Sequence, residues 1–194
     1  MKTQELTTVL NGLDTTRIVE TINAIKDQPS LGRFQFRVRN KWIDGGVNRS
    51  IIQDFYGAGR EDDSRSKPFV FTNGEPPVLL GNNEGANPVE FLLHALAGCV
   101  TTTFVIYAAA RGIRVERLST ELEGDLDARG LLGLDESVSP GYKQIRIKLD
   151  VKADCSEKEL EELVALAQKY SPVFNTISRP VPVIVERTRA KNVR

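Results

Sequence analysis

Histidine, tryptophan, methionine and cysteine are scarce in this sequence, and their scarcity limits its chemistry. The 194 residues include one His, one Trp, one Met and two Cys. Two Cys are too few for a disulfide framework, and they lack the spacing of a metal site. The single histidine, His94, leaves room for one Cys–His pair at most. We therefore expect neither a metal nor a cofactor.

The sequence also lacks an excess of charge of either sign. Lys and Arg together number 26, as do Asp and Glu, so the formal net charge is zero. Nucleic acids and anionic membranes both attract a net basic surface, and we expect neither as a partner. The first residues contain no apolar run of signal-peptide length, which favours a reducing cytoplasmic location.

The N-terminal residues predict a helical extension ahead of a single domain. Asp14 is a helix cap, Ile18, Ile22 and Ile25 recur at helical spacing, and Pro29 ends the pattern. The length of 194 residues suits one compact domain. We expect residues 1–30 to form the extension and residues 31–194 to form that domain.

Residues 33–42 alternate between apolar and basic side chains, which predicts a half-buried strand with one basic face. A turn at 44–46 and a returning strand over 47–56 complete a hairpin. Residues 60–67 are highly charged and predict a loop, and residues 68–72 predict a short strand. The basic face carries Arg33, Arg37, Arg39 and Lys41.

The longest apolar segment runs over residues 89–110, after Asn87 as a predicted N-cap. As a helix it would extend about 33 Å, enough to cross a bilayer. Glu90 and His94 within it argue against a membrane span and favour the central buried helix of a globular core. One layer of sheet covers only one side of such a helix, so we infer a second subunit.

The C-terminal half returns to strand periodicity and then to a helix. Residues 118–126 and 145–151 predict two strands, and Ser156 with Glu159 predicts the start of a helix that Pro172 ends. Residues 181–187 predict a last strand, and Pro182 within it places this strand at or near the edge of a sheet. Short connections between strands favour antiparallel pairing, so the fold class is α+β.

Cys99 lies in the middle of the long helix, where a cysteine most often serves as a small buried hydrophobe. His94 lies about 140° around the helix from it, and Glu90 about 180°, so neither is placed as its base. Thr102 and Thr103 share its face and are candidate hydrogen-bond partners.

A reactive Cys99 would need a cation from elsewhere, and the basic hairpin supplies candidates. A solvated strand surface is the equally simple explanation of that basic face. The other thiol, Cys155, directly precedes Ser156 at a predicted helix start, which favours a thiolate. A cysteine in an exposed loop is, however, more often incidental.

Several motifs in order carry a resemblance to a known family. The runs NPVEFLLHALAGCVTTT, EGDLDARGLLGL, GYKQIRIKLDV and YSPVFNTI, followed by VPVIVE, resemble the OsmC/Ohr family over roughly residues 33–188. The resemblance implies a strongly curved, mainly antiparallel sheet wrapped around two central helices. It also implies an intertwined homodimer with active sites at the subunit interface. Active members are thiol peroxidases that reduce organic hydroperoxides and hydrogen peroxide in the oxidative stress response.

By this resemblance Cys99 matches the peroxidatic cysteine of the long helix, while Ser171 occupies the position of the second cysteine. Val89 replaces the glutamate of typical hydroperoxide-resistance members, which is similar to a less characterised subgroup. The thiolate-activating arginine of the family comes from the hairpin region, and Arg39 or Arg49 is the candidate here.

Three functions follow from these matches. The first is a one-Cys peroxidase that reduces organic hydroperoxides through Cys99, with an external thiol as reductant. The second is a non-catalytic dimeric module that binds a small hydrophobic ligand in an interfacial pocket. The third is a hydrolase with Cys99 as nucleophile, which the lack of a histidine base disfavours.

Overall fold

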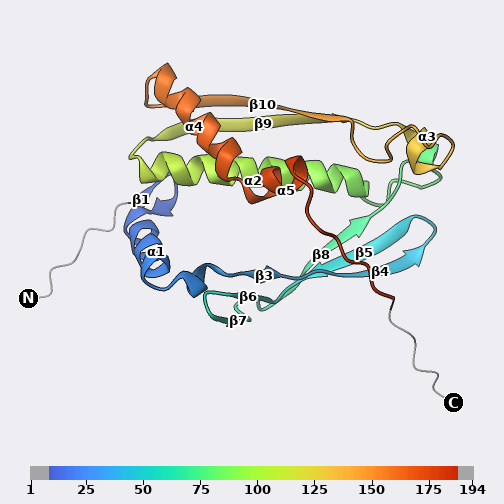
Figure 1. The fold of residues 1–194 in the computed structure, drawn as a ribbon, viewed down its shortest axis with the longest axis horizontal. Helices are drawn as coiled ribbons and strands as arrows, with labels where there is room; N and C mark the ends of the chain where they lie inside the picture. The colour runs from blue at the N-terminus through green and yellow to red at the C-terminus, as the bar shows by residue number, and fades with distance from the viewer. Residues whose placement is uncertain (1–8, 188–194) are drawn as a thin grey trace, which may run out of the picture.

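The computed structural model describes residues 9–187, which form two layers with the long helix α2 between them (Figure 1). One layer holds β9, β10, α4 and α5, and the other holds α1 and the strands β3–β8. The helices are α1 (Thr15–Asp27), α2 (Pro88–Ala110), α3 (Ala128–Leu131), α4 (Glu157–Tyr170) and α5 (Pro172–Ser178), with 3₁₀ turns at Pro29–Gly32 and Pro77–Leu79.

The strands form four small sheets in which all pairs of named strands are antiparallel. This arrangement confirms the α+β class, although in one chain the sheets stay separate. Two sheets are pairs, β1 (Val9–Leu10) with β2 (Leu13–Asp14) and β9 (Val115–Asp125) with β10 (Gln144–Ala153). In the other two the central strand is β6 (Phe55–Gly57), between β3 (Gln35–Phe36) and β7 (Arg60–Asp62), and β5 (Val47–Ile52), between β4 (Arg39–Asp44) and β8 (Phe69–Asn73).

The start of α2 is confirmed as predicted, because local chemistry determines it. The Asn87 side chain accepts a hydrogen bond from the Val89 amide at 2.9 Å, and the Glu90 carboxylate accepts one from the Asn87 amide at 2.8 Å. Pro88 takes the first helical position, where its missing N–H costs nothing.

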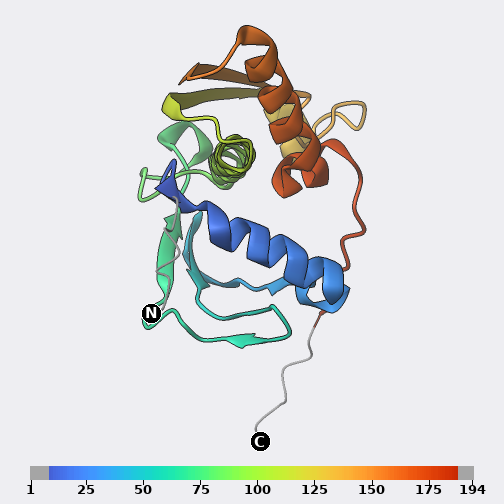
Figure 2. The ribbon, with the colours of Figure 1, turned by 90° about the vertical axis from the view of Figure 1, so that its left-hand side faces the viewer.

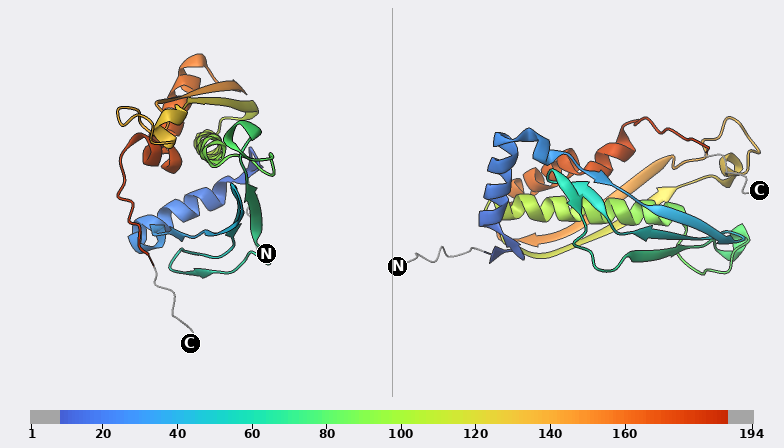
Figure 3. Two further views of the ribbon diagram at one scale, coloured as in Figure 1. Left: turned by 90° about the vertical axis from the view of Figure 1, so that its right-hand side faces the viewer. Right: turned by 90° about the horizontal axis from the view of Figure 1, so that it is seen from below.

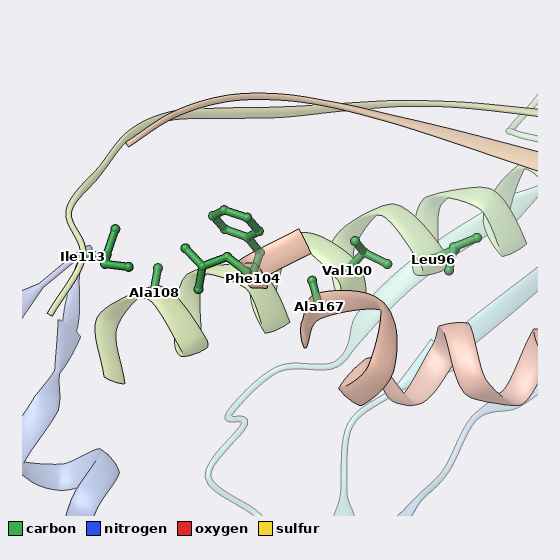
Figure 4. Packing of buried hydrophobic residues seen from close by; sticks show 7 residues of the cluster. Leu96, Val100, Phe104, Ala108, Ile113 and Ala167 are labelled. Carbon is green, nitrogen blue, oxygen red and sulfur yellow. The ribbon is translucent and has the colours of Figure 1, made fainter. Parts of the chain in front are cut away.

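The core lies where one face of α2 meets α4 and the β9–β10 sheet (Figure 4). Phe104 and Leu163 are fully buried there. The side of α2 that faces α1 has less cover, and Ile106 on that side is 39% exposed. Burial on all sides, as expected from the sequence, is therefore not achieved within one chain. The buried cluster consists of Leu96, Val100, Phe104, Ala108, Ile113, Leu163 and Ala167.

By length and composition alone, α2 could cross a membrane. It is the one helix among residues 9–187 that meets this test. Core helices of soluble proteins also meet it, so the observation is weak support for a membrane span. Its contacts with α4, α5 and β9 are those of a core helix.

The N-terminal strands differ from the sequence prediction in two respects. The region 33–42 divides into β3 and β4, and β4 is exposed along its whole length rather than half-buried. Residues 60–62, predicted as loop, form β7 because Ala58 and Gly59 adopt positive φ and turn the chain back onto β6.

The C-terminal prediction of a strand over residues 181–187 is wrong, since these described residues adopt no regular structure. Pro180 and Pro182 each lack the N–H that a sheet ladder requires. Pro172 ends α4 as predicted, but it also opens α5, which the sequence reasoning missed.

Residues 1–8 of the predicted extension lie outside the described residues, and α1 packs near the C-terminal end of α2 (Figures 2 and 3). Asp14 caps α1 as predicted, with its carboxylate accepting from the Arg17 amide at 3.1 Å. Asn11 lies in the turn between β1 and β2 and attaches this hairpin to the chain just after α2. Its amide donates to the Ile113 carbonyl and accepts from the Val115 N–H, both at 2.9 Å.

Candidate functional site

The two residues that the sequence reasoning singled out on different helices lie in direct contact. The Ser171 hydroxyl donates a hydrogen bond to the Cys99 sulfur, with the oxygen and sulfur atoms 3.1 Å apart. Ser171 is fully buried, whereas Cys99 is half-buried. The contact joins the middle of α2 to the junction between α4 and α5.

Ser171 holds its position because it ends one helix and caps the next. Its backbone is extended, with φ −66° and ψ 118°, which stops α4 after Tyr170. Its hydroxyl accepts a hydrogen bond from the Phe174 amide at 3.2 Å. With its acceptor role occupied by this amide, the hydroxyl has its proton free to donate to the sulfur.

Thr103, one of the two predicted hydroxyl partners, bonds to the backbone of Cys99 rather than to its thiol. Its hydroxyl donates to the backbone carbonyl of Cys99 at 2.8 Å, four residues back along α2. The hydrogen bond to the Cys99 sulfur therefore comes from Ser171 rather than from the helix that carries the thiol.

A stacked pair of tyrosines joins α2, which carries Cys99, to the end of α4, next to Ser171. The Tyr107 and Tyr170 rings lie 5.2 Å apart between centroids at an interplanar angle of 18°. Burial raises the pKa of Tyr107, and the neighbouring Tyr170 raises it further. The sequence reasoning missed this pair, although Tyr170 directly precedes Ser171 and Tyr107 lies two turns after Cys99.

Arg39 and Arg49 lie on the sheet face turned away from α2. The opposite face is identified by Phe71, whose ring meets Phe91 of α2 edge-on at 6.0 Å. Arg49 pairs with Thr72, the neighbour of Phe71, and therefore points to the other face, and Arg39 shares the side of Arg49. Within residues 9–187, no arginine is hydrogen-bonded to Cys99 or Ser171.

The other titratable groups near the sequence motif are occupied elsewhere. The His94 ring is exposed and packs edge-on against Phe91, with centroids 6.4 Å apart. Glu90 serves the capping box of α2. Cys155 precedes α4 and packs against the core. Burial raises the pKa of its thiol, and the carboxylate of Glu159 raises it further. None of the three thus forms a pair with Cys99.

Comparison with protein families identifies the chain. The family model of OsmC-like proteins matches residues 81–186, which is more than half of the 194 residues. The chain belongs to the OsmC-like family. No curated protein matches the sequence.

Solved structures support the same fold for this OsmC-like protein. An OsmC-like protein from Mycoplasma pneumoniae aligns with a TM-score of 0.58 and 19% identity, over 74% of this chain and 87% of its own. A putative osmotic stress induced and detoxification response protein from Psychrobacter arcticus aligns with a TM-score of 0.55 and 16% identity, over 74% of this chain and 88% of its own. An organic hydroperoxide resistance protein from Elizabethkingia anophelis aligns with a TM-score of 0.50 and 14% identity, over 75% of this chain and 89% of its own.

A cavity of about 430 Å³ lies near the site of this OsmC-like protein. It is bounded mainly by apolar side chains of α2, β10 and α5, among them Leu96 and Phe174. Phe174 also donates its amide to Ser171, which places the cavity beside the contact with Cys99. No group of three or more His, Cys, Asp or Glu among the described residues is arranged to hold a metal.

Proposed function

We propose that the protein is a one-Cys thiol peroxidase that reduces organic hydroperoxides through Cys99. The observation that carries the proposal is the hydrogen bond from Ser171 to the Cys99 sulfur at 3.1 Å. Members of the family with two cysteines would have a thiol at the position of Ser171. Here a hydroxyl contacts the sulfur, and it cannot form a disulfide.

The proposed reaction proceeds through a sulfenic acid. The Cys99 thiolate attacks one oxygen of the hydroperoxide, the O–O bond breaks, and the alkoxide leaves as an alcohol after taking up a proton. An external thiol then attacks the sulfenic sulfur and releases water, and a second thiol reduces the resulting mixed disulfide. Ser171 orients the sulfur in each state through its hydroxyl. A reducing cytoplasm would supply the thiols.

An intertwined homodimer belongs to the same proposal. Within the described chain β9 and β10 pair only with each other, which leaves their outer edges open. Strands from a second copy would extend them into one curved sheet around the helices. Arg39 or Arg49 remains the candidate cation, and since both point away from α2 of their own chain, such a role requires the Cys99 of the other copy.

Trapping the sulfenic acid tests the proposal directly. One equivalent of cumene hydroperoxide is added in the presence of dimedone, and intact mass with peptide mapping locates the adduct. We expect one adduct on Cys99, none on Cys155, and none in a Cys99→Ser variant. Absence of an adduct together with slow alkylation of Cys99 would refute the peroxidase.

A binding module is the alternative that one observation favours. The apolar cavity of about 430 Å³ has the size and lining typical of a site for a small hydrophobic ligand. In that case an apolar ligand would bind with equal affinity to the wild type and to Cys99→Ala, and no hydroperoxide would be consumed.

A further inference from the structure

A second apolar cavity lies between α1, with the end of β2, and the C-terminal end of α2. Its volume is about 550 Å³, within the range of small-molecule sites. Ile18 and Ile22 of α1 form one wall, and Ile106, Tyr107 and Ala110 of α2 form the other. The wall from α1 lies outside residues 81–186, the part that matches the family model.

One face of α2 connects this cavity to the thiol. Cys99, Thr102, Ile106 and Ala110 are spaced by three, four and four residues, so they lie in a stripe along one side of the helix, and Thr102, Ile106 and Ala110 are exposed there. Ile106 and Ala110 line the cavity at the far end of this stripe. The axial distance from Cys99 to Ile106 is about 10 Å at 1.5 Å per residue.

The tyrosine stack makes a second connection. Tyr107 lines the cavity, and its ring stacks on Tyr170, which directly precedes Ser171. The aromatic pair therefore continues the apolar surface from the cavity wall to the residue that contacts the Cys99 sulfur. Tyr170 is 46% exposed and Ile106 39% exposed, so this surface is accessible in the chain.

We propose that the cavity binds the alkyl tail of a substrate whose hydroperoxide group lies at Cys99, and that Ile18 and Ile22 make long-chain substrates preferred. The inference rests on the proposed peroxidase for the reactive end and on the cavity lining for the tail. A compact hydroperoxide such as tert-butyl hydroperoxide spans less than the distance to Ile106 and gains nothing from α1. An unbranched dodecyl chain reaches the cavity and buries its methylenes there.

Apart from the Tyr107 hydroxyl, the polar side chains that line the cavity lie on α1 and at the end of β2. Asp14 caps the helix and Arg17 ion-pairs with it at 3.7 Å, so each has a partner nearby. The Arg17 side chain is 83% exposed and extends into solvent. The apolar walls are left for the ligand.

The test compares two substrates in a variant that fills the cavity. Ile18→Trp places a larger side chain in the cavity, while the control Val19→Trp changes the next residue, which is 56% exposed and does not line it. The rate constant for oxidation of Cys99 is measured with dodecyl hydroperoxide and with tert-butyl hydroperoxide. We expect Ile18→Trp to slow the dodecyl reaction about ten-fold, the effect of excluding one or two methylenes. The tert-butyl reaction, and both reactions of Val19→Trp, should stay at the wild-type rate.

A binding measurement separates this inference from the peroxidase itself. A dansyl-labelled undecanoic acid should bind to the wild type and to Cys99→Ser equally, and about ten-fold more weakly to Ile18→Trp. If Cys99 proves unreactive and this pattern holds, the peroxidase fails and the tail site stands. Ile22→Trp, at a position 45% exposed, repeats the test should Ile18→Trp not fold.

Two results would overturn the inference. One is an unchanged dodecyl rate and unchanged probe affinity in both tryptophan variants. The other is conversion of a dimer into a monomer by Ile18→Trp but not by Val19→Trp, measured by sedimentation, because the cavity would then be covered by a second copy of the chain.

Discussion

The Ser171 hydroxyl and the Cys99 sulfur are joined by a hydrogen bond of 3.1 Å, although the two residues are 72 positions apart in the sequence. The same hydroxyl caps α5 by accepting the Phe174 amide. Ser171 therefore links the structure of the helix junction to the environment of the thiol, and substitutions can separate these two roles.

Ser171→Cys should convert the contact into a reducible disulfide. The two side chains already touch, and a disulfide needs the sulfur atoms to approach to about 2.05 Å, a shift of about an ångström that side-chain rotation can supply. After oxidation we expect two thiols lost per chain and Cys155 still free, measured by thiol titration and non-reducing peptide mapping. Ser171→Cys combined with Cys99→Ser should lose neither. Retention of all thiols in the single variant would show that the observed contact does not persist in solution.

Ser171→Ala should destabilise the fold more than the loss of an ordinary cap. Removing an exposed helix cap costs about 1 kcal/mol, whereas an amide shielded from water that loses its acceptor costs about 1–3 kcal/mol, and the Phe174 amide bonds to the fully buried Ser171. Ser156→Ala is the matched control, because Ser156 caps α4 through Glu159 but is exposed. Urea unfolding should show the larger loss for Ser171→Ala. Equal losses would contradict a buried role for its hydroxyl.

Local chemistry explains which parts of the fold could be predicted. The start of α2 follows from Asn87 and Pro88, residues that act on their immediate neighbours. The strand expected over residues 181–187 failed because prolines remove the hydrogen-bond donors of a ladder, an effect stronger than the alternation of apolar residues. Division of the sheet into separate pieces depends on contacts between distant segments, which periodicity does not report.

The same distinction holds for the site. Alternation places Arg39 on the basic face of its strand, but the pairing with β5 is needed to place Arg49 on the same face, and the contact of Phe71 with α2 shows that this face is turned away from α2. The pairing of Cys99 with Ser171 was accessible through the family resemblance alone. No local signal connects positions on two helices that are so far apart in the sequence.

Asn11 should be required for the attachment of α1. Asn11→Gly retains the positive φ of 53° and removes the side chain that bonds to the backbone of Ile113 and Val115. Two hydrogen bonds contribute about 1–3 kcal/mol together. We expect faster hydrogen exchange throughout α1 and unchanged exchange in α4. Asn83→Gly, at φ 57° and exposed, is the control and should leave both unchanged. Unchanged exchange in α1 of Asn11→Gly would mean that apolar contacts alone hold the helix.

Cys155 should react only at alkaline pH. Burial raises its pKa, and the carboxylates of Glu159, Asp154 and Glu157 raise it further. The folded state thus holds this proton more tightly than the unfolded state, so its contribution to stability is present below the ordinary thiol pKa of about 8.5 and is lost as the pH rises through the folded value. Iodoacetamide labelling in a Cys99→Ser background should be slower at pH 8 than in urea, and Glu157→Gln should accelerate it. Equal rates in folded and unfolded chains would contradict the shift.

Trp42→Glu should dissociate the proposed homodimer. Trp42 is 67% exposed on the sheet face that also carries Phe71, the face directed toward α2, and its indole is a large apolar side chain that a second, intertwined copy would cover. Losing the burial of this side chain costs about 2–3 kcal/mol, and an unpaired carboxylate in the interface costs more. Sedimentation should show a dimer for the wild type and at least a hundred-fold weaker association for the variant, about 2.7 kcal/mol. Val78→Glu, at an 85% exposed position outside this sheet, should remain dimeric. A monomeric wild type, or a Trp42→Glu variant that stays fully dimeric, would exclude this face as the interface.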